Sequence, residues 1–247
     1  MSTPLIIAAL TDEVRDLKAK LAIDLCIHFK PATLHRGLLF NKELELLITG
    51  MGADRMKKGL KEALAQKKPS SILYAGYAGG TSPVASLGTL VLSKFVVDEK
   101  SQKRFASNKD LLHQARKICE TQKWSYQVGG MVTVDRVVSS PHEKADLGAV
   151  HEAIALDMEA FAVAEIANDN NIPWLVVKSI LDPVEMQLPD LQDCIEPTGE
   201  PKPIHLMEHL FKQPKDLMKL SNIQYCANQA RNTLAQFIEA WIFGLNL

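Results

Sequence analysis

The sequence predicts an α/β protein, a single domain over residues 1–247 built as a three-layer αβα sandwich with a twisted mixed central sheet. Short apolar runs such as Leu5–Leu10, bounded by polar residues, are typical of strands covered on both faces. Segments with apolar residues at helical spacing, such as Ala53–Gln66, stand between these runs. Because the two kinds of segment alternate through most of the chain, a layered α/β domain is expected.

Each predicted strand is a mostly apolar run that is interrupted by glycine, proline or charged residues. In chain order the predicted strands are 5–10, 44–48, 71–75, 89–97, 127–134, 152–156 and 174–181. Thr49–Gly52 is predicted to form the turn after the second of them, and Gly76–Gly80 the turn after the third.

The predicted helices begin at Thr11 and cover 53–66, 110–120, 158–167 and 221–242. Thr11 is a capping residue type and is followed by acids in the first turn. Pro69 lies just beyond the amphipathic second helix, and the mostly apolar 158–167 helix is predicted to be buried. The last helix carries a long apolar stripe, so we expect it to pack on the sheet. The proline-rich segment 186–203 predicts an irregular loop before it.

The composition excludes several classes of function. Lys plus Arg number 28 and Asp plus Glu 29, so the net charge is −1 and no nucleic-acid partner is expected. No stretch approaches the ~20 apolar residues of a membrane span. The 4 cysteines form no CxxC pair and Leu5–Leu10 is too short for a signal sequence, so we expect reduced thiols and a cytoplasmic location.

Polar or glycine-rich clusters follow the predicted strands, where ligands bind in open α/β sheets. They are Thr11–Glu13, Thr49–Gly52, Gly76–Gly80 and Asp182. Gly50-Met51-Gly52 suggests a dinucleotide site, but the third glycine of that motif is replaced by Arg55, and a tight turn is the alternative. The glycines of Gly76–Gly80 would let a ligand lie against backbone, or would form a bulge.

Three carboxylates have both a structural and a functional interpretation. Glu159 precedes an apolar helix, so it either caps that helix or binds sugar hydroxyls. Asp182 follows a buried strand, where desolvation would suit a general acid, or it forms an Asx-turn before proline. Glu13 is either a first-turn helix acid or part of the same site.

The histidines offer one metal hypothesis. His205 and His209 fit the H-x-x-E-H pattern of inverted zinc peptidases, but the sequence supplies no third ligand. A structural or surface pair is therefore favoured, and no metal site is expected. A GxSxG elbow and a P-loop are both missing from the sequence.

Six short motifs occur in the order seen in the purine nucleoside phosphorylase and methylthioadenosine/S-adenosylhomocysteine nucleosidase superfamily. The motifs are Ala9–Val14, Thr49–Gly52, Gly76–Gly80, Leu87–Val91, Leu156–Ala160 and Val177–Asp182. The chain resembles this superfamily over residues 5 to 183, and the resemblance implies a nucleoside phosphorylase-like fold. The segment with Leu188-Pro189 is similar to the hopanoid-associated phosphorylase branch.

The resemblance implies cleavage of the N-glycosidic bond of a purine nucleoside or 5′-substituted nucleoside, by phosphorolysis or hydrolysis. Asp182 would protonate the departing base at N7, and Glu13 would activate water. The implied substrate-binding residues are Glu159 and Met158 at the sugar, Gly79 and Tyr77 in the glycine motif, and Val137 and Val138 at the base. Such cleavage passes through an oxocarbenium-like state, which needs an acid for the leaving group and a negative environment for the sugar.

The resemblance also implies that no organic cofactor is needed and that the chain forms a homo-oligomer. Inorganic phosphate is the co-substrate if the reaction is phosphorolysis, and Arg55 is the one candidate to bind it. Tyr77, Leu181 and Val137 depart from the serine, serine and aromatic residue of the family. These departures fit an alternative, a non-catalytic nucleoside-binding or storage protein, whereas the three carboxylates favour an enzyme.

Overall fold

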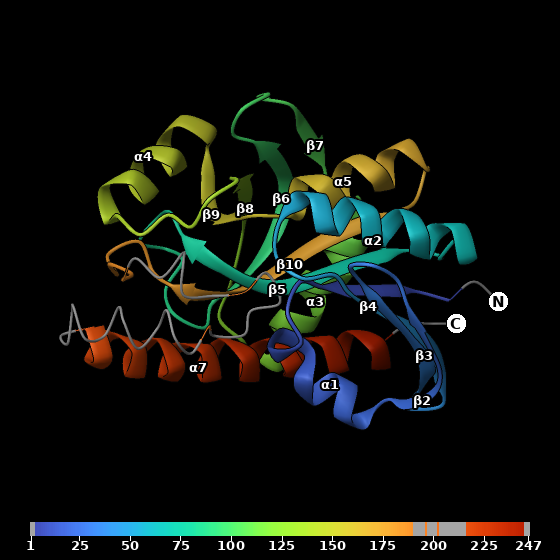
Figure 1. The fold of residues 1–247 in the computed structure, drawn as a ribbon. Coiled ribbons are helices and arrows are strands. Elements are labelled where there is room, and N and C mark those ends of the chain that lie inside the picture. The colour runs from blue at the N-terminus through green and yellow to red at the C-terminus, as the bar shows by residue number, and fades with distance from the viewer. Residues whose placement is uncertain (1–2, 190–195, 197–201, 203–215, 245–247) are drawn as a thin grey trace.

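The chain folds around a ten-stranded mixed sheet with helices on both sides, seen in a computed structural model (Figure 1). The structure describes residues 3–189, 196, 202 and 216–244, and side chains in the last range from residue 221. The strands are β1 Leu5–Ala8, β2 Ala22–His28, β3 Thr33–Leu39, β4 Lys42–Ile48, β5 Ile72–Gly80, β6 Leu90–Asp98, β7 Arg104–Ala106, β8 Tyr126–Thr133, β9 Ala153–Asp157 and β10 Trp174–Asp182. The helices are the 3-10 helix η1 Asp12–Val14, then α1 Arg15–Lys20, α2 Ala53–Gln66, α3 Lys109–Gln122, α4 Pro141–His151, α5 Ala160–Asp169 and α7 Asp216–Phe243.

Strand β5 is the branch point of the sheet. One edge pairs in parallel with β10 from Ile72 onward, while the other edge pairs first with β1 and then, at Gly79 and Gly80, with β9. Since β10 continues through β6 and β8 to β9, five strands close into a ring, and β1, β4, β3 and β2 extend from it. The predicted layered α/β architecture is confirmed, whereas the closure of part of the sheet into a ring was not predicted.

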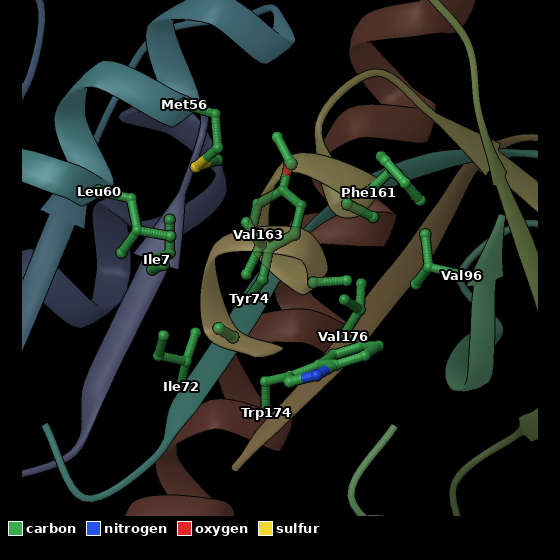
Figure 2. Close-up of a cluster of buried hydrophobic side chains, with 14 of the residues drawn as sticks. Ile7, Met56, Leu60, Ile72, Tyr74, Val96, Phe161, Val163, Trp174 and Val176 are labelled. Carbon is green, nitrogen blue, oxygen red and sulfur yellow. The ribbon is translucent and has the colours of Figure 1, made fainter. Parts of the chain in front are cut away.

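Alternation along the strands divides the core between the two faces of the sheet. Leu5 and Ile7 of β1 lie in the cluster with α2 and α5, whereas Ile6 and Ala8 lie in the cluster with α7 and α3. Figure 2 shows the first cluster, in which side chains of α2 and α5 pack over those of β1, β5 and β10. Trp241 of α7 is fully buried in the second, as the apolar stripe predicts.

Several predicted details are wrong. Gly76–Gly80 is the end of β5 rather than a turn, because its backbone pairs with β10 and β9. Thr11 has helical dihedral angles and makes no side-chain cap. The prediction missed β2, β3 and the short β7, as well as α4. Nearly every residue of β2 is exposed, and α4 lacks a clear apolar face, so neither has the periodicity that reveals an element.

The irregular loop predicted for 186–203 begins as expected, without regular structure over 186–189. Most of it, together with His205 and His209, lies outside the described residues, so the zinc hypothesis stays untested there. A single domain over 1–247 stays a prediction for the same reason. Among the described helices, none has the length and apolar character to cross a membrane.

Candidate active site

The carboxyl ends of the central strands surround a pocket of about 200 Å³. Its lining comprises Ala9, Leu10, Glu13, Met51, Tyr77, Ala78, Gly79, Arg136, Val137, Val138, Leu156, Asp157, Met158, Glu159, Leu181, Asp182 and Leu188. All eight residues predicted for the site are in this lining, which we call the acidic pocket. A larger hollow of about 840 Å³, between α3 and the end of α7, includes none of the eight.

Glu13 reaches the pocket from η1 and is held by backbone amides. Its Oε2 accepts hydrogen bonds from the N–H groups of Ala9 at 2.9 Å and Leu10 at 2.8 Å, and its Oε1 accepts one from Tyr77 at 2.8 Å. Burial raises the pKa of Glu13, while Lys178 and these amides oppose the rise. The residue is only 3% exposed, so Glu13 is a buried carboxyl group of fixed orientation rather than a surface acid of the first helical turn.

Glu159 enters the pocket from the start of α5 without capping that helix. Its Oε1 accepts from the Gly52 amide at 2.6 Å, and its Oε2 accepts from the Tyr74 hydroxyl at 2.8 Å. The first amide of α5 is instead bonded by the carboxylate of Asp157. Burial, and then the charge of Asp157, raises the pKa of Glu159 to about 7. The Glu159 carboxylate therefore does not cap α5, and it lines the pocket where a ligand can contact it.

The turn at Gly50–Gly52 has the conformation that the tight-turn interpretation requires. Gly50 and Gly52 have φ values of 81° and 99°, in the left-handed region that glycine adopts most readily. The Gly52 amide points to Glu159, so it is not free for a phosphate group. Arg55, the suggested phosphate ligand, lies in α2 and is not part of the pocket lining.

Asp182 ends β10 and is paired with a buried lysine. Lys144 Nζ of α4 lies 2.6 Å from Asp182 Oδ2, and Lys144 is completely buried. Burial raises the pKa of Asp182, and Lys144 opposes this rise. Asp182 lines the acidic pocket, as its functional interpretation requires.

A second buried ion pair involves Asp157, which lines the pocket. Lys178 Nζ lies 3.1 Å from Asp157 Oδ2 and 3.6 Å from the centre of the Tyr74 ring. Asp157 also accepts from the Thr133 hydroxyl at 2.9 Å. Because Lys178 also lowers the pKa values of Glu13 and Glu159, it links the carboxylates electrostatically.

The glycines of β5 make room for these charged groups rather than for a ligand alone. A Cβ atom on Gly76 would lie 2.5 Å from Glu13 Oε1 and 3.0 Å from Lys178 Nζ. A Cβ atom on Gly79 would lie 3.1 Å from Asp182 Oδ2. The glycine motif therefore brings the backbone of β5 against two of the pocket carboxylates.

Tyr77 lines the pocket and also connects β5 to the C-terminal helix. Its hydroxyl donates to Asp12 Oδ2 at 2.7 Å, and Arg231 of α7 donates to Asp12 Oδ1 at 3.0 Å. The residue that replaces the family's serine thus has a structural partner outside the pocket. Val137 and Val138 also line the pocket, Val137 being 46% exposed and Val138 buried.

Sequence reasoning missed both lysines. Lys178 had a detectable signal, since a lone cation in the apolar run 174–181 requires a buried partner. Lys144 had none, because its neighbours His142, Glu143 and Asp146 are charged or polar and suggest a solvated helix face.

A family description of the phosphorylase superfamily matches residues 4–197. The chain belongs to this superfamily. Curated relatives of the chain are 5′-methylthioadenosine/S-adenosylhomocysteine nucleosidases, from Haemophilus influenzae at 28% identity and Staphylococcus saprophyticus at 24%. Both alignments cover 72% of this chain, and they cover 84% and 85% of the relatives respectively.

Solved structures of the superfamily share the fold. The nucleosidase of Neisseria meningitidis in complex with methylthio-immucillin-A has a TM-score of 0.79 and 17% identity, over 99% of this chain and 100% of that one. The native futalosine hydrolase of Helicobacter pylori has a TM-score of 0.78 and 16% identity, over 99% and 98%. The predicted phosphorylase-like fold is confirmed, whereas membership of the hopanoid-associated branch stays a prediction.

Proposed function

We propose that this member of the phosphorylase superfamily hydrolyses the N-glycosidic bond of a 5′-substituted purine nucleoside. The observation that carries the proposal is that Glu13, Glu159 and Asp182, far apart in the chain, line one pocket. The named nucleosidases among the relatives confirm the prediction of an enzyme that cleaves the bond between a ribosyl carbon and a base. The roles of the individual residues are our assignment.

The charge of the pocket suits the chemistry of this bond. Glu13, Asp157, Glu159 and Asp182 are all at least nine-tenths buried, and two buried lysines stand beside them. Carboxylates therefore outnumber cations where the ribosyl group would lie. A sugar that develops positive charge as the base departs is stabilised by such preorganised negative charge.

Three of these four carboxylates have a distinct task in the proposal. Glu159 accepts hydrogen bonds from the ribosyl hydroxyls, with Met158 beside the sugar. Glu13 takes a proton from the attacking water, which fits a carboxylate whose orientation is fixed by three amides. Asp182 gives a proton to N7 of the base, which would lie against Gly79, Val137 and Val138.

Water rather than phosphate is the proposed nucleophile because the cations at the pocket are already paired. Arg136 donates to Glu99 at 2.7 and 2.9 Å and to Glu143 at 2.7 and 3.1 Å. Lys144 and Lys178 each face an aspartate. A phosphate site requires cationic donors that are free to bind it, and the described lining of the acidic pocket presents none.

We infer a cytoplasmic location, since Cys26, Cys119 and Cys226 are all free thiols. The homo-oligomer stays a prediction, because the structure describes one chain. The proposal includes no metal or organic cofactor in the reaction, in keeping with the acid, base and charge that the side chains already supply.

Base release from a panel of adenine and hypoxanthine nucleosides, with and without 5′ substituents, tests the proposal. We expect release in the absence of phosphate and no acceleration when phosphate is added. Asp182→Asn should lower turnover by about 10²–10⁴-fold, the usual contribution of a general acid. Release that requires phosphate would make the protein a phosphorylase. Binding without release from any nucleoside would favour the non-catalytic alternative.

A further inference from the structure

Lys144 makes contacts that suit a permanently placed ammonium group. Besides the Asp182 carboxylate at 2.6 Å, its Nζ donates to the carbonyl oxygens of Met186 at 2.9 Å and Pro183 at 3.3 Å. An ammonium has three protons, and three acceptors surround this one. With the Asp182 carboxylate ionised, all three partners are acceptors, so the arrangement matches a protonated lysine.

This pairing changes how Asp182 can act as an acid. Burial raises the pKa of Asp182, but the ammonium 2.6 Å away opposes that rise by stabilising the ionised carboxylate, and an ionised carboxylate has no proton to give. The other titratable group that faces it is Cys226 of α7, a thiol whose pKa is raised by burial and then by the charge of Asp182. Of these two groups among the described residues, Lys144 is the one that contacts the Asp182 carboxylate at hydrogen-bond distance.

We infer that Lys144 is the proton source for the departing base and acts through Asp182. Lys144 is fully buried and is not in the pocket lining, so it reaches the substrate only by way of the aspartate. Because Lys144 acts through another residue, it is a positioning residue. Its contacts with two backbone carbonyl groups also hold the segment 183–186, which leads to Leu188 at the pocket. The inference rests on the proposed function.

As the C1′–N9 bond breaks, its electron pair stays on the base, and a proton passes from Lys144 Nζ to Asp182 and from Asp182 to N7. Water bonds to C1′ and gives its proton to Glu13. Lys144 is left neutral and Glu13 protonated, so the net charge of the site is unchanged, and exchange with solvent restores both groups.

The experiment compares two leaving groups attached to the same ribosyl group. One substrate is the purine nucleoside that the wild-type protein cleaves, and the other is the matching p-nitrophenyl riboside, whose nitrophenolate leaves without being protonated. For Lys144→Met at about pH 9 we expect nucleoside kcat to fall about 10²-fold, with KM little changed and riboside turnover close to wild type. At about pH 6 the nucleoside kcat should recover, because the unpaired Asp182 then carries its own proton.

Two further variants separate proton supply from charge and from folding. Lys144→Arg keeps the positive charge but does not release a proton, so its nucleoside turnover should stay low at both pH values. Glu13→Gln should slow both substrates, since each needs an activated water. Thermal unfolding of every variant checks that it is folded.

Equal slowing of both substrates by Lys144→Met at every pH would overturn the inference, as would full nucleoside turnover by Lys144→Arg. Cleavage of neither substrate by the wild-type protein would instead overturn the proposed function. The two failures are therefore distinguishable.

Discussion

Lys144 Nζ lies 2.6 Å from Asp182 Oδ2, and this contact joins helix α4 to the end of β10 inside the protein. Lys144 is 0% and Asp182 6% exposed, so neither charge is compensated by bulk water. Removing one partner of such a pair leaves a buried charge alone, which is far more destabilising than removing both. The contact therefore stabilises the packing of α4 against β10, and it also favours the ionised form of Asp182.

The stability of the fold should reveal this coupling. We expect Lys144→Met and Asp182→Asn each to lower the free energy of unfolding by about 3 kcal/mol near neutral pH. The double variant should lose clearly less than the sum of the two single losses, because no uncompensated charge remains. Urea unfolding of the four proteins measures the coupling, and additive losses would show that the pair is energetically independent.

Glu13→Gln should abolish most activity and also lower stability. The side-chain amide presents a donor where the carboxylate accepted three backbone N–H groups, so at least one of those amides loses its partner. A buried unsatisfied amide costs about 1–3 kcal/mol. Steady-state kinetics and urea unfolding measure the two effects. Asp16→Asn, a first-turn acid of the neighbouring helix α1 that does not line the pocket, is the matched control and should leave turnover unchanged.

Gly76→Ala should lower kcat more than it alters KM. The new Cβ would lie 2.5 Å from Glu13 Oε1, so the carboxylate must move away from the attacking water. Gly79→Ala is the comparison, because its Cβ would lie 3.1 Å from Asp182 Oδ2 and 3.3 Å from a Leu156 methyl group, where the base is proposed to bind. For that variant we expect mainly a higher KM. The opposite pattern in the two variants would contradict the placement of water and base.

Much of the fold could be predicted because its signal is local. Helix α2 follows from the apolar face of Ala53–Gln66, and β1 from an uninterrupted apolar run. The closure of the sheet could not be predicted, since the pairing of Gly79 and Gly80 with β9 joins segments far apart in the chain. Strand β2 was missed because an exposed edge strand has no apolar alternation to reveal it.

The candidate site shows the same division between local and distant signals. Glu13, Glu159 and Asp182 could be named because each carboxylate follows an apolar strand or precedes an apolar helix, where a charge requires an explanation. Their common pocket is a property of the fold. The partner of Asp182 could not be predicted, because a lysine in a charged helix such as α4 is ordinarily solvated.

Activity and stability should respond to pH in opposite directions through Glu159. Its pKa is raised to about 7 by burial and by Asp157, with Lys178 and the Tyr74 hydroxyl opposing. Between about pH 4.5 and 7 the folded protein keeps a proton that the unfolded chain has lost, so the free energy of unfolding falls as pH rises. The resulting fall in the free energy of unfolding is about 3 kcal/mol and is complete above pH 7.

Over the same range kcat/KM should rise, because the ionised form of Glu159 is the better acceptor for two ribosyl hydroxyls. The rise should have an apparent pKa of about 7 in the free enzyme and level off above it. Glu159→Gln, which cannot ionise, should lower kcat/KM and remove this limb of the profile. Its amide oxygen can still accept from the Gly52 N–H, and its NH2 group can donate to the Tyr74 hydroxyl oxygen. A limb that persists unchanged in the variant would assign the titration to another group, and Glu13, whose pKa is also raised by burial, would be the next to substitute.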